Sequence, residues 1–170
     1  MNKKIRFLVQ GALIAALYVV MTYVANLFGL ASGVIQVRIS EALTVLPFFT
    51  PAAIPGLFVG CLLSNLLTGC APWDVVFGSL ATLLGALGTY AIAHSGKGSK
   101  LIKKWAAPLP PILANTLIIP WVLRFVYAAP DSIPFLMLTV GAGEVISCGF
   151  LGLILLFALE PRAGHIFRNA

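Results

Sequence analysis

Residues 7–27 read FLVQGALIAALYVVMTYVANL, an apolar stretch that contains no charged side chain. A helix needs about 20 such residues to cross a hydrocarbon core of about 30 Å, so this stretch predicts a transmembrane helix. A signal peptide also begins with basic residues and an apolar run, but its apolar region is shorter, at about 7–15 residues. We therefore expect residues 7–27 to form the first membrane span.

The remainder of the chain has the composition of an integral membrane protein. Of its 170 residues, 60% are hydrophobic and 9% are charged, whereas soluble domains carry about 25% charged residues. The apolar stretches are Phe7–Leu27, Ala42–Leu67, Val75–Ala93, Ala106–Val126 and Phe135–Leu159. Because Pro47, Pro51 and Pro55 interrupt the second stretch, it is predicted to form two short spans joined near Pro51. The sequence thus predicts an all-α fold: one domain, residues 1–170, with a bundle of six transmembrane helices.

Basic residues predict how this bundle is oriented. Nine of the eleven lysines and arginines fall into three clusters, namely Lys3, Lys4 and Arg6, then Lys97, Lys100, Lys103 and Lys104, then Arg162 and Arg168. Cytoplasmic loops collect lysine and arginine, and an even number of predicted spans separates neighbouring clusters. Both termini are therefore predicted to be cytoplasmic. We interpret the net charge of +6 as a sign of topology and expect no nucleic-acid partner.

Motifs for catalysis or nucleotide binding are missing from the sequence. The nearest phosphate-loop candidate, residues 96–99, lacks both the earlier glycine and the serine or threonine that should follow the lysine. Cys61, Cys70 and Cys148 do not have metal-ligand spacing, and we interpret them as small apolar filling. We therefore expect a non-catalytic chain without a metal site, and ATP-driven work would have to come from a partner.

Two polar residues are predicted to lie deep in the membrane. Glu144 is nine residues from Phe135, which places it about 14 Å below the outer surface at 1.5 Å per residue. A charge at that depth costs on the order of 3 kcal/mol, so Glu144 should face the bundle interior and belong to a functional site. Asn115 is eleven residues from Val126, or about 16 Å deep, and is predicted to share a cavity with Glu144. The alternative for Asn115 is a hydrogen bond between helices.

Further candidates lie on the predicted outer side: Arg38, Glu41, Asn65, Trp73 and Asp74. Each of the charged ones also has a structural interpretation. Glu41 could favour a helix start through the helix dipole, with Ser40 as the cap. Arg38 could pair with Glu41 three residues later, and Asp74 could cap an interfacial helix. Aromatic residues at span ends are expected at the membrane–water interface, namely Trp73, Trp105 and Tyr127.

The first span also carries small residues at regular spacing. Gly11 with Ala15, and Ala12 with Ala16, form two overlapping small-x-x-x-small pairs. Such pairs allow two helix backbones to approach closely. They predict either packing inside the bundle or docking against another membrane protein.

Four segments carry a resemblance to a known family. They are Gln36–Pro47 (QVRISEALTVLP), Ile54–Asn65 (IPGLFVGCLLSN), Pro72–Thr82 (PWDVVFGSLAT) and Gly141–Ser147 (GAGEVIS). These segments resemble the QueT family, whose members are substrate-specific S components of energy-coupling factor (ECF) transporters assigned to queuosine precursors. The likeness extends over nearly the whole chain.

The resemblance implies a six-helix subunit of a bacterial cell membrane, surrounded by lipid, that binds a small molecule from outside. It would dock on a module of one transmembrane coupling protein and two ATPase subunits. Those partners would use ATP, and this chain would need no cofactor of its own. The pair Ala12 and Ala16 matches the small-residue face that the family uses for docking on the coupling protein.

The implied ligand is a 7-deazaguanine with a cyano or an aminomethyl substituent. Glu144 is our first choice to accept hydrogen bonds from its N1–H and exocyclic amine, because a carboxylate can accept both at once. Asn65 and Asn115 are expected to contact the O6 carbonyl or the pyrrole N–H. The other expected roles are stacking by Trp73, anchoring of the external loop by Arg38 and Glu41, and attraction of a cationic substituent by Asp74.

Two other functions remain open at this point. One is a stand-alone secondary transporter or channel for another small polar solute, although no internal repeats are evident. Uptake that follows an ion gradient without ATPase partners would indicate it. The other is a structural membrane protein without a ligand, for which a deeply buried carboxylate has no purpose.

Overall fold

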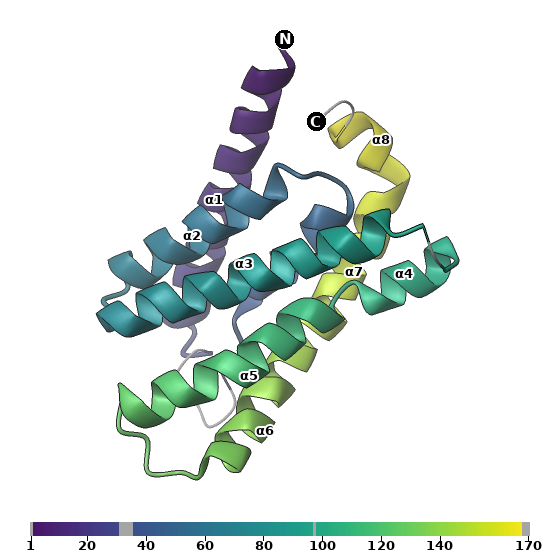
Figure 1. Ribbon diagram of the computed structural model, residues 1–170. Coiled ribbons are helices and arrows are strands. Elements are labelled where there is room, and N and C mark those ends of the chain that lie inside the picture. The colour runs from purple at the N-terminus through teal and green to yellow at the C-terminus, as the bar shows by residue number, and fades with distance from the viewer. Residues whose placement is uncertain (1, 31–35, 97, 168–170) are drawn as a thin grey trace.

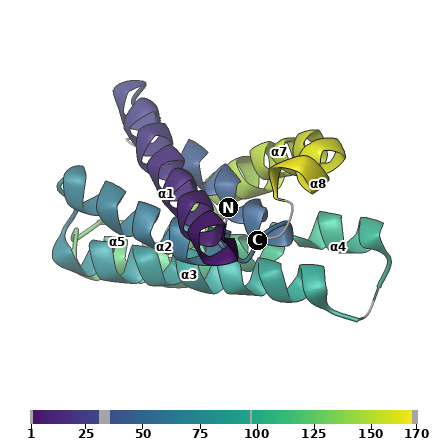
Figure 2. The same ribbon diagram turned by 90° about the horizontal axis from the view of Figure 1, so that it is seen from above.

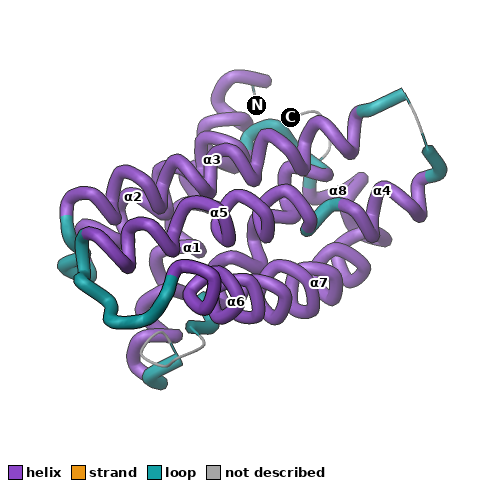
Figure 3. Tube along the Cα trace, turned by 60° about the horizontal axis from the view of Figure 1, so that its bottom comes forward, coloured by secondary structure: helices purple, strands orange, loops and turns teal. Residues whose placement is uncertain are grey.

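The computed structural model describes residues 2–30, 36–96 and 98–167, and all regular elements in these ranges are helices (Figures 1 and 3). Four helical runs are long and apolar enough to cross a membrane. They are α1 (Lys3–Leu27), α3 (Pro72–His94), the run Lys100–Phe125 and the run Ile133–Ile166. Two apolar helices are shorter, η1 (Ile39–Phe48) and α2 (Ala53–Leu67). The all-α prediction is confirmed, with four helices of full length where six were expected.

The two longest runs are composite. The run Lys100–Phe125 consists of α4 (Lys100–Ala106) and α5 (Leu109–Phe125). The run Ile133–Ile166 consists of α6 (Ile133–Glu144), the π-helix η2 (Val145–Leu151), α7 (Gly152–Leu159), η3 (Glu160–Arg162) and α8 (Ala163–Ile166). The change from α- to π-helical hydrogen bonding therefore begins directly after Glu144.

The predicted break near Pro51 is present, but the helix before it has an unexpected form. Residues 39–48 form a 3-10 helix that contains Pro47, and α2 begins only at Ala53. Ten residues of 3-10 helix rise about 20 Å and fifteen residues of α-helix about 22 Å, both less than a hydrocarbon core of about 30 Å. Residues 40–47 are all buried, between α1, α2, α3, η2 and α7. η1 is therefore a core element and not a lipid-facing span.

Small residues bring α1 and α2 into close contact. A Cβ added to Gly56 would lie 2.6 Å from the carbonyl oxygen of Gly11, and one added to Gly60 would lie 3.0 Å from the Cα of Ala15. Only hydrogen atoms fit at these two positions, so Gly56 and Gly60 form a small-x-x-x-small pair opposite the pair on α1. α3 and α5 are in similar contact, since a Cβ on Gly85 would lie 2.6 Å from the Cα of Pro111.

Both termini lie at the same end of the bundle, which we call the terminal end (Figures 1 and 2). There Gln10 Nε2 donates to the carbonyl oxygen of Ile166 over 3.3 Å, and Glu160 accepts from Lys104 over 2.5 Å. The start of α1, α4 and η3 directly before α8 lie at this end, and they carry the described basic residues of the three clusters: Lys3, Lys4, Arg6, Lys100, Lys103, Lys104 and Arg162. Lys97 and Arg168 lie outside the described residues. The connections from α2 to α3 and from α5 to α6 are at the opposite end (Figure 1).

Candidate functional site

A cavity of about 380 Å³, the main cavity, lies at the opposite end of the bundle. Its lining includes polar side chains from α1, the segment before η1, α2, α3 and the turn after α5, among them Tyr18, Gln36, Arg38, Asn65, Asp74 and Tyr127. The volume is within the range of about 300–1,000 Å³ that is usual for small-molecule sites. Five parts of the chain therefore converge on one polar hollow.

Three of the predicted site residues line the main cavity: Arg38, Asn65 and Asp74. Asn65 and Asp74 are both buried and lie on either side of Gly78, where an added Cβ would be 3.0 Å from Asn65 Nδ2 and 3.6 Å from Asp74 Oδ1. A side chain at position 78 would push into these polar groups. The absence of one at Gly78 thus preserves the shape of the cavity wall.

Asp74 is held by the turn that follows α5. The hydroxyl of Tyr127 donates to Asp74 Oδ2 over 2.9 Å and accepts from the backbone N–H of Ala71 over 3.0 Å. Partial burial, together with the hydrogen bond to Asp74 and its negative charge, raises the pKa of Tyr127 to about 12. The hydroxyl therefore keeps its proton and fixes the carboxylate of Asp74, which is at the third position of α3 and not its cap.

Arg38 is the cation of the main cavity. Burial alone would lower the pKa of its guanidinium, but the nearby carboxyl groups of Asp74 and Glu41 hold that pKa above its ordinary value. The predicted ion pair between Arg38 and Glu41 does not form. The ion pairs among the described residues join Glu160 to Lys100 and to Lys104. Ser40 is not a helix cap either; its hydroxyl accepts a hydrogen bond from Thr22 over 2.9 Å.

Glu41 is much deeper than its predicted position at the surface end of a span. It is 1% exposed, and it accepts hydrogen bonds at Oε1 from the hydroxyl of Tyr18 and, over 3.3 Å, from Thr82. Tyr18 also lines the main cavity, so its hydroxyl connects the lining of the cavity to this carboxylate. The reason for the depth is that η1 begins inside the bundle, which carries residues 40–47 into the core.

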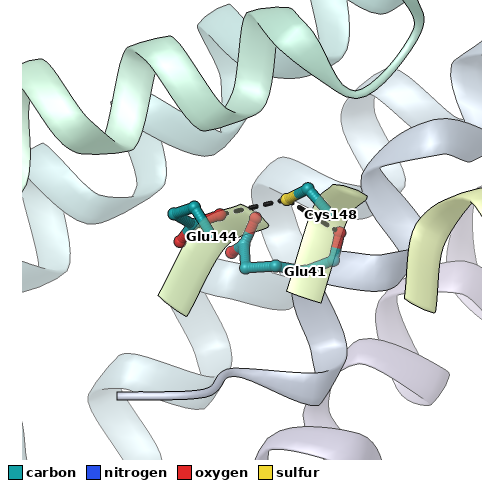
Figure 4. Close-up of side chains that lie close together, drawn as sticks. All are labelled: Glu41, Glu144 and Cys148. Atoms are coloured by element: carbon teal, nitrogen blue, oxygen red, sulfur yellow. Dashed lines mark hydrogen bonds between the residues drawn. The ribbon is translucent and has the colours of Figure 1, made fainter. Parts of the chain in front are cut away.

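Glu41 and Glu144 lie close together with Cys148 (Figure 4). One ligand atom of each residue lies within 4.8 Å of the other two. The thiol of Cys148 donates to Glu144 Oε2 over 3.0 Å and is 3.4 Å from the carbonyl oxygen of Glu41. Two carboxylates and a thiol at these distances could hold a divalent cation, a possibility that sequence spacing did not indicate. In the arrangement described, the thiol serves as a hydrogen-bond donor.

Asn115 lies beside both carboxyl groups, as its predicted depth indicates. It is 3% exposed, and neither its Nδ2 atom nor Glu41 Oε2 has a hydrogen-bond partner among the described residues. Buried donors and acceptors without partners are costly, at about 1–3 kcal/mol each. Asn115 and Glu41 therefore each keep a buried polar atom that a ligand could satisfy.

Trp73 is not brought into this site. Its side chain is 60% exposed on the outside of α3, where it stacks against Phe77 with ring centroids 6.0 Å apart. It lines an apolar groove between α3 and α5 with Trp121 and Phe125. This position agrees with an interfacial aromatic residue, and it removes Trp73 from the set that can stack on a ligand in the main cavity.

Comparison with known proteins gives the family. A family model described as "QueT transporter" matches residues 8–161. The chain belongs to the QueT transporter family. It is also similar to the "Queuosine precursor transporter QueT" of Lactococcus lactis subsp. cremoris (strain MG1363), with 40% identity over 78 residues. The matched segment covers 45% of this chain and 45% of the relative, which is less than half the length of the relative. No solved structure matches.

Family membership and the four span-length helices together make this chain a multi-pass membrane protein. The family model is described as a transporter, and the polar residues that meet at the opposite end of the bundle are the candidate site in this chain.

The two small-residue pairs of α1 separate in the structure. Gly11 and Ala15 are buried against α2, whereas Ala12 and Ala16 are exposed on the outer face of the helix. The packing interpretation applies to Gly11 and Ala15, and docking through Ala12 and Ala16 stays a prediction. The outer face also exposes large apolar side chains, including Leu13 and Val20.

Several residues of the site were not predicted: Tyr18, Gln36, Thr82, Tyr127 and Cys148. Two of them had a detectable signal. Tyr18 lies in the middle of the first apolar stretch, where a hydroxyl needs a buried partner, and Cys148 follows Glu144 by one helical turn. The position of Gln36 depends on a loop path that sequence periodicity does not describe.

Proposed function

We propose that this chain is the substrate-binding S component of an ECF-type importer for a queuosine precursor. The observation that carries the proposal is the polar main cavity, to which the Glu41–Glu144 pair is connected by the hydrogen bond from Tyr18 to Glu41. Membership of the QueT transporter family and the name of the Lactococcus relative support this solute class. Because the sequence has no nucleotide-binding motif, ATP-driven uptake would take its energy from partner subunits.

The chemistry of a 7-deazaguanine fits the free polar groups. Its pyrimidine edge carries N1–H and an exocyclic amine, which are neighbouring donors, next to the O6 acceptor. Glu144 is the proposed acceptor of the donor pair, aided by the free Oε2 of Glu41, and Asn115 Nδ2 is the proposed donor to O6. Adenine-like edges lack that donor pair, so the same groups would exclude them. Asn65 would contact the opposite edge of the ring from the cavity wall.

The charges around the cavity favour a cationic ligand. Three carboxyl groups, those of Glu41, Asp74 and Glu144, lie around the single guanidinium of Arg38. Glu41 and Glu144 lie together and cannot both be ionised unless a cation compensates them, which a positively charged ligand would do. An aminomethyl substituent supplies a positive charge and a nitrile does not. We therefore infer that the aminomethyl form binds more tightly than the cyano form.

The orientation follows from the basic residues. Seven described lysines and arginines of the three clusters are at the terminal end, whereas Arg38 and Arg124 are the described basic residues at the opposite end. By the positive-inside rule the terminal end is cytoplasmic, so the main cavity faces the outside of the cell membrane. This is the orientation that an uptake protein requires.

Coupling to ATP hydrolysis would occur through the exposed face of α1. Ala12 and Ala16 leave a shallow strip between large apolar side chains, which suits close packing against a transmembrane coupling protein. Two partner ATPase subunits would supply the energy, and no cofactor in this chain is needed.

Equilibrium binding to the purified chain in detergent tests the proposed function. The ligands are aminomethyl- and cyano-7-deazaguanine, with guanine and thiamine as controls, and tryptophan fluorescence or calorimetry is the readout. We expect saturable binding with the order aminomethyl, cyano, guanine, and no binding of thiamine. Well-folded protein that binds neither deazaguanine would contradict the queuosine-precursor assignment.

A further inference from the structure

The apolar groove between α3 and α5 is separate from the main cavity. It has a volume of about 1040 Å³, and its lining consists of leucine, isoleucine, valine, phenylalanine and tryptophan side chains. The described residues that line the groove and those that line the main cavity do not overlap. A large exposed apolar surface of this kind marks a site of contact with a membrane or a partner.

The groove has the depth of one membrane leaflet. On α3 it extends from Trp73 to Leu84, a rise of about 16 Å, and on α5 from Leu117 to Val126, a rise of about 14 Å. Each leaflet contributes half of a hydrocarbon core of about 30 Å. Directly past Leu84 the two helices come into backbone contact, at Gly85 and Pro111. The groove therefore begins at the opposite end of the bundle and ends near the middle of the membrane, as the acyl chains of one leaflet do.

Two aromatic pairs form the sides of the groove at the opposite end. Trp73 stacks on Phe77 along α3, and Trp121 stacks on Phe125 along α5 with ring centroids 6.1 Å apart. Tryptophan is enriched where acyl chains meet headgroups, because its ring is apolar and its N–H is polar. Each ring is held by its stacked neighbour. The two sides of the groove are thus preformed at the level of the lipid headgroups.

A positive charge lies at the same end of α5. Arg124 is exposed and follows Trp121 by three residues, which places both on one face of the helix. Its Nη1 donates to the carbonyl oxygen of Ala129 over 2.6 Å, which uses one of its five N–H donors. The ion pairs in the described part of the chain join Glu160 to lysines, so Arg124 has no carboxylate partner there. A phosphate group is an anion that an arginine fork matches well.

We propose that the groove is a binding site for one phospholipid, with its acyl chains between α3 and α5 and its phosphate on Arg124. In the proposed orientation this lipid belongs to the outer leaflet. The site itself does not depend on the ligand of the main cavity. Because Asp74 on α3 and Tyr127 after α5 both line that cavity, the bound lipid supports two of its walls from the outside.

Quenching of tryptophan fluorescence in the full chain, purified in detergent, tests the site. The probe is phosphatidylglycerol with brominated acyl chains, since bromine quenches nearby tryptophan. The chain has three tryptophans, and a Trp105→Phe background leaves Trp73 and Trp121, which both line the groove. We expect saturable quenching that excess unbrominated phosphatidylglycerol reverses. Diacylglycerol with the same chains should need about fivefold more, because it lacks the phosphate that pairs with Arg124.

Two variants with matched controls locate the lipid. Leu83→Phe places a larger ring in the groove and should raise the concentration for half-saturation about tenfold, whereas Leu87→Phe lies one turn further along α3 outside the groove and should leave it unchanged. Arg124→Gln should raise it about fivefold for phosphatidylglycerol and not for diacylglycerol. Arg162→Gln, at the terminal end, should have no effect.

Quenching that rises in proportion to the lipid content, without saturation and equally in all variants, would overturn the proposal, since it would show general contact with lipid only. If Leu83→Phe does not fold, Arg124→Gln remains decisive because it changes an exposed side chain. An unchanged half-saturation in that variant would overturn the site as proposed. These titrations contain no deazaguanine, so their failure is distinguishable from failure of the proposed function.

Discussion

Two buried carboxyl groups that face one another need compensation, because like charges at such a distance cannot both be ionised without a partner. Around Glu41 and Glu144 the compensating groups are the hydroxyl of Tyr18, the thiol of Cys148 and the charge of Arg38. Glu41 Oε2 remains without a hydrogen bond among the described residues. The pair is therefore arranged for a ligand that brings donors or positive charge.

Replacement of Glu144 by glutamine tests its role. Glu144→Gln keeps the size of the side chain but replaces one acceptor with an amide donor, which would oppose the donor pair of the ligand. Since a hydrogen bond to a charged group contributes about 1.5–3 kcal/mol, we expect the affinity for aminomethyl-7-deazaguanine to fall by about ten- to a hundredfold. Equilibrium binding in detergent measures this change.

The matched control is Glu160→Gln at the terminal end, where Glu160 pairs with Lys100 and Lys104 far from the main cavity. We expect its affinity to be that of wild type. Unchanged affinity of a well-folded Glu144→Gln variant would show that this carboxylate does not contact the ligand.

At the scale of elements, the contact between α1 and α2 depends on two glycines. Gly56→Ala would place a Cβ 2.6 Å from the carbonyl oxygen of Gly11, so the helices must separate. Overpacking of this kind costs about 1–3 kcal/mol, and we expect a lower melting temperature in detergent. Gly149→Ala is the control, because its Cβ would meet only side-chain atoms at 3.7 and 3.8 Å. Equal melting temperatures for the two variants would contradict the tight contact.

The outer face of α1 makes a separate prediction about assembly. Ala12→Leu combined with Ala16→Leu fills the exposed strip without touching α2, so ligand binding should be retained. We expect the double variant to lose co-purification with the coupling protein when both are co-expressed. Ala91→Leu, an exposed alanine of α3, is the control and should keep the complex. A complex that survives the double variant would place docking on another surface.

Sequence patterns predicted most elements because membrane spans are defined by long apolar runs. The break near Pro51 and the all-helical fold both followed from proline chemistry and from the length of the apolar runs. The 3-10 form of η1 did not. Its residues 40–47 are all buried, so the helix has no polar face that would give the sequence a helical periodicity. For the same reason Glu41 was expected at the surface, and its contact with Glu144 was missed.

Long-range pairings were the other part that sequence could not supply. The pair on α1 indicated close packing but not that Gly56 and Gly60 were the partners. Trp73 has an aromatic ring that could stack on a ligand, yet the rotation of α3 about its axis turns the side chain outward. Such outcomes depend on the relative rotation of whole helices, which a single sequence leaves open.

The molecule as a whole has two chemically different ends. The terminal end carries the described residues of the basic clusters, and the opposite end carries the main cavity. This polarity connects two proposals: the orientation in the membrane and the capture of ligand from outside. Both require the main cavity to be open to the outer medium.

A cysteine of the chain reports on that cavity directly. Cys70 lines the main cavity and is partly exposed, whereas Cys61 and Cys148 are buried. A membrane-impermeant maleimide applied to intact cells should therefore label Cys70 first, and the Cys70→Ser variant should show little labelling. The reagent reaches Cys70 from outside only if the cavity opens there.

The most direct measurement is the rate of this labelling with and without aminomethyl-7-deazaguanine. The account predicts that saturating ligand slows the labelling of Cys70 by about tenfold or more, as expected for a bound ligand that covers its site, while thiamine has no effect. Labelling of Cys70 at an unchanged rate, at ligand concentrations that saturate binding, would contradict the assignment of the main cavity as the substrate site.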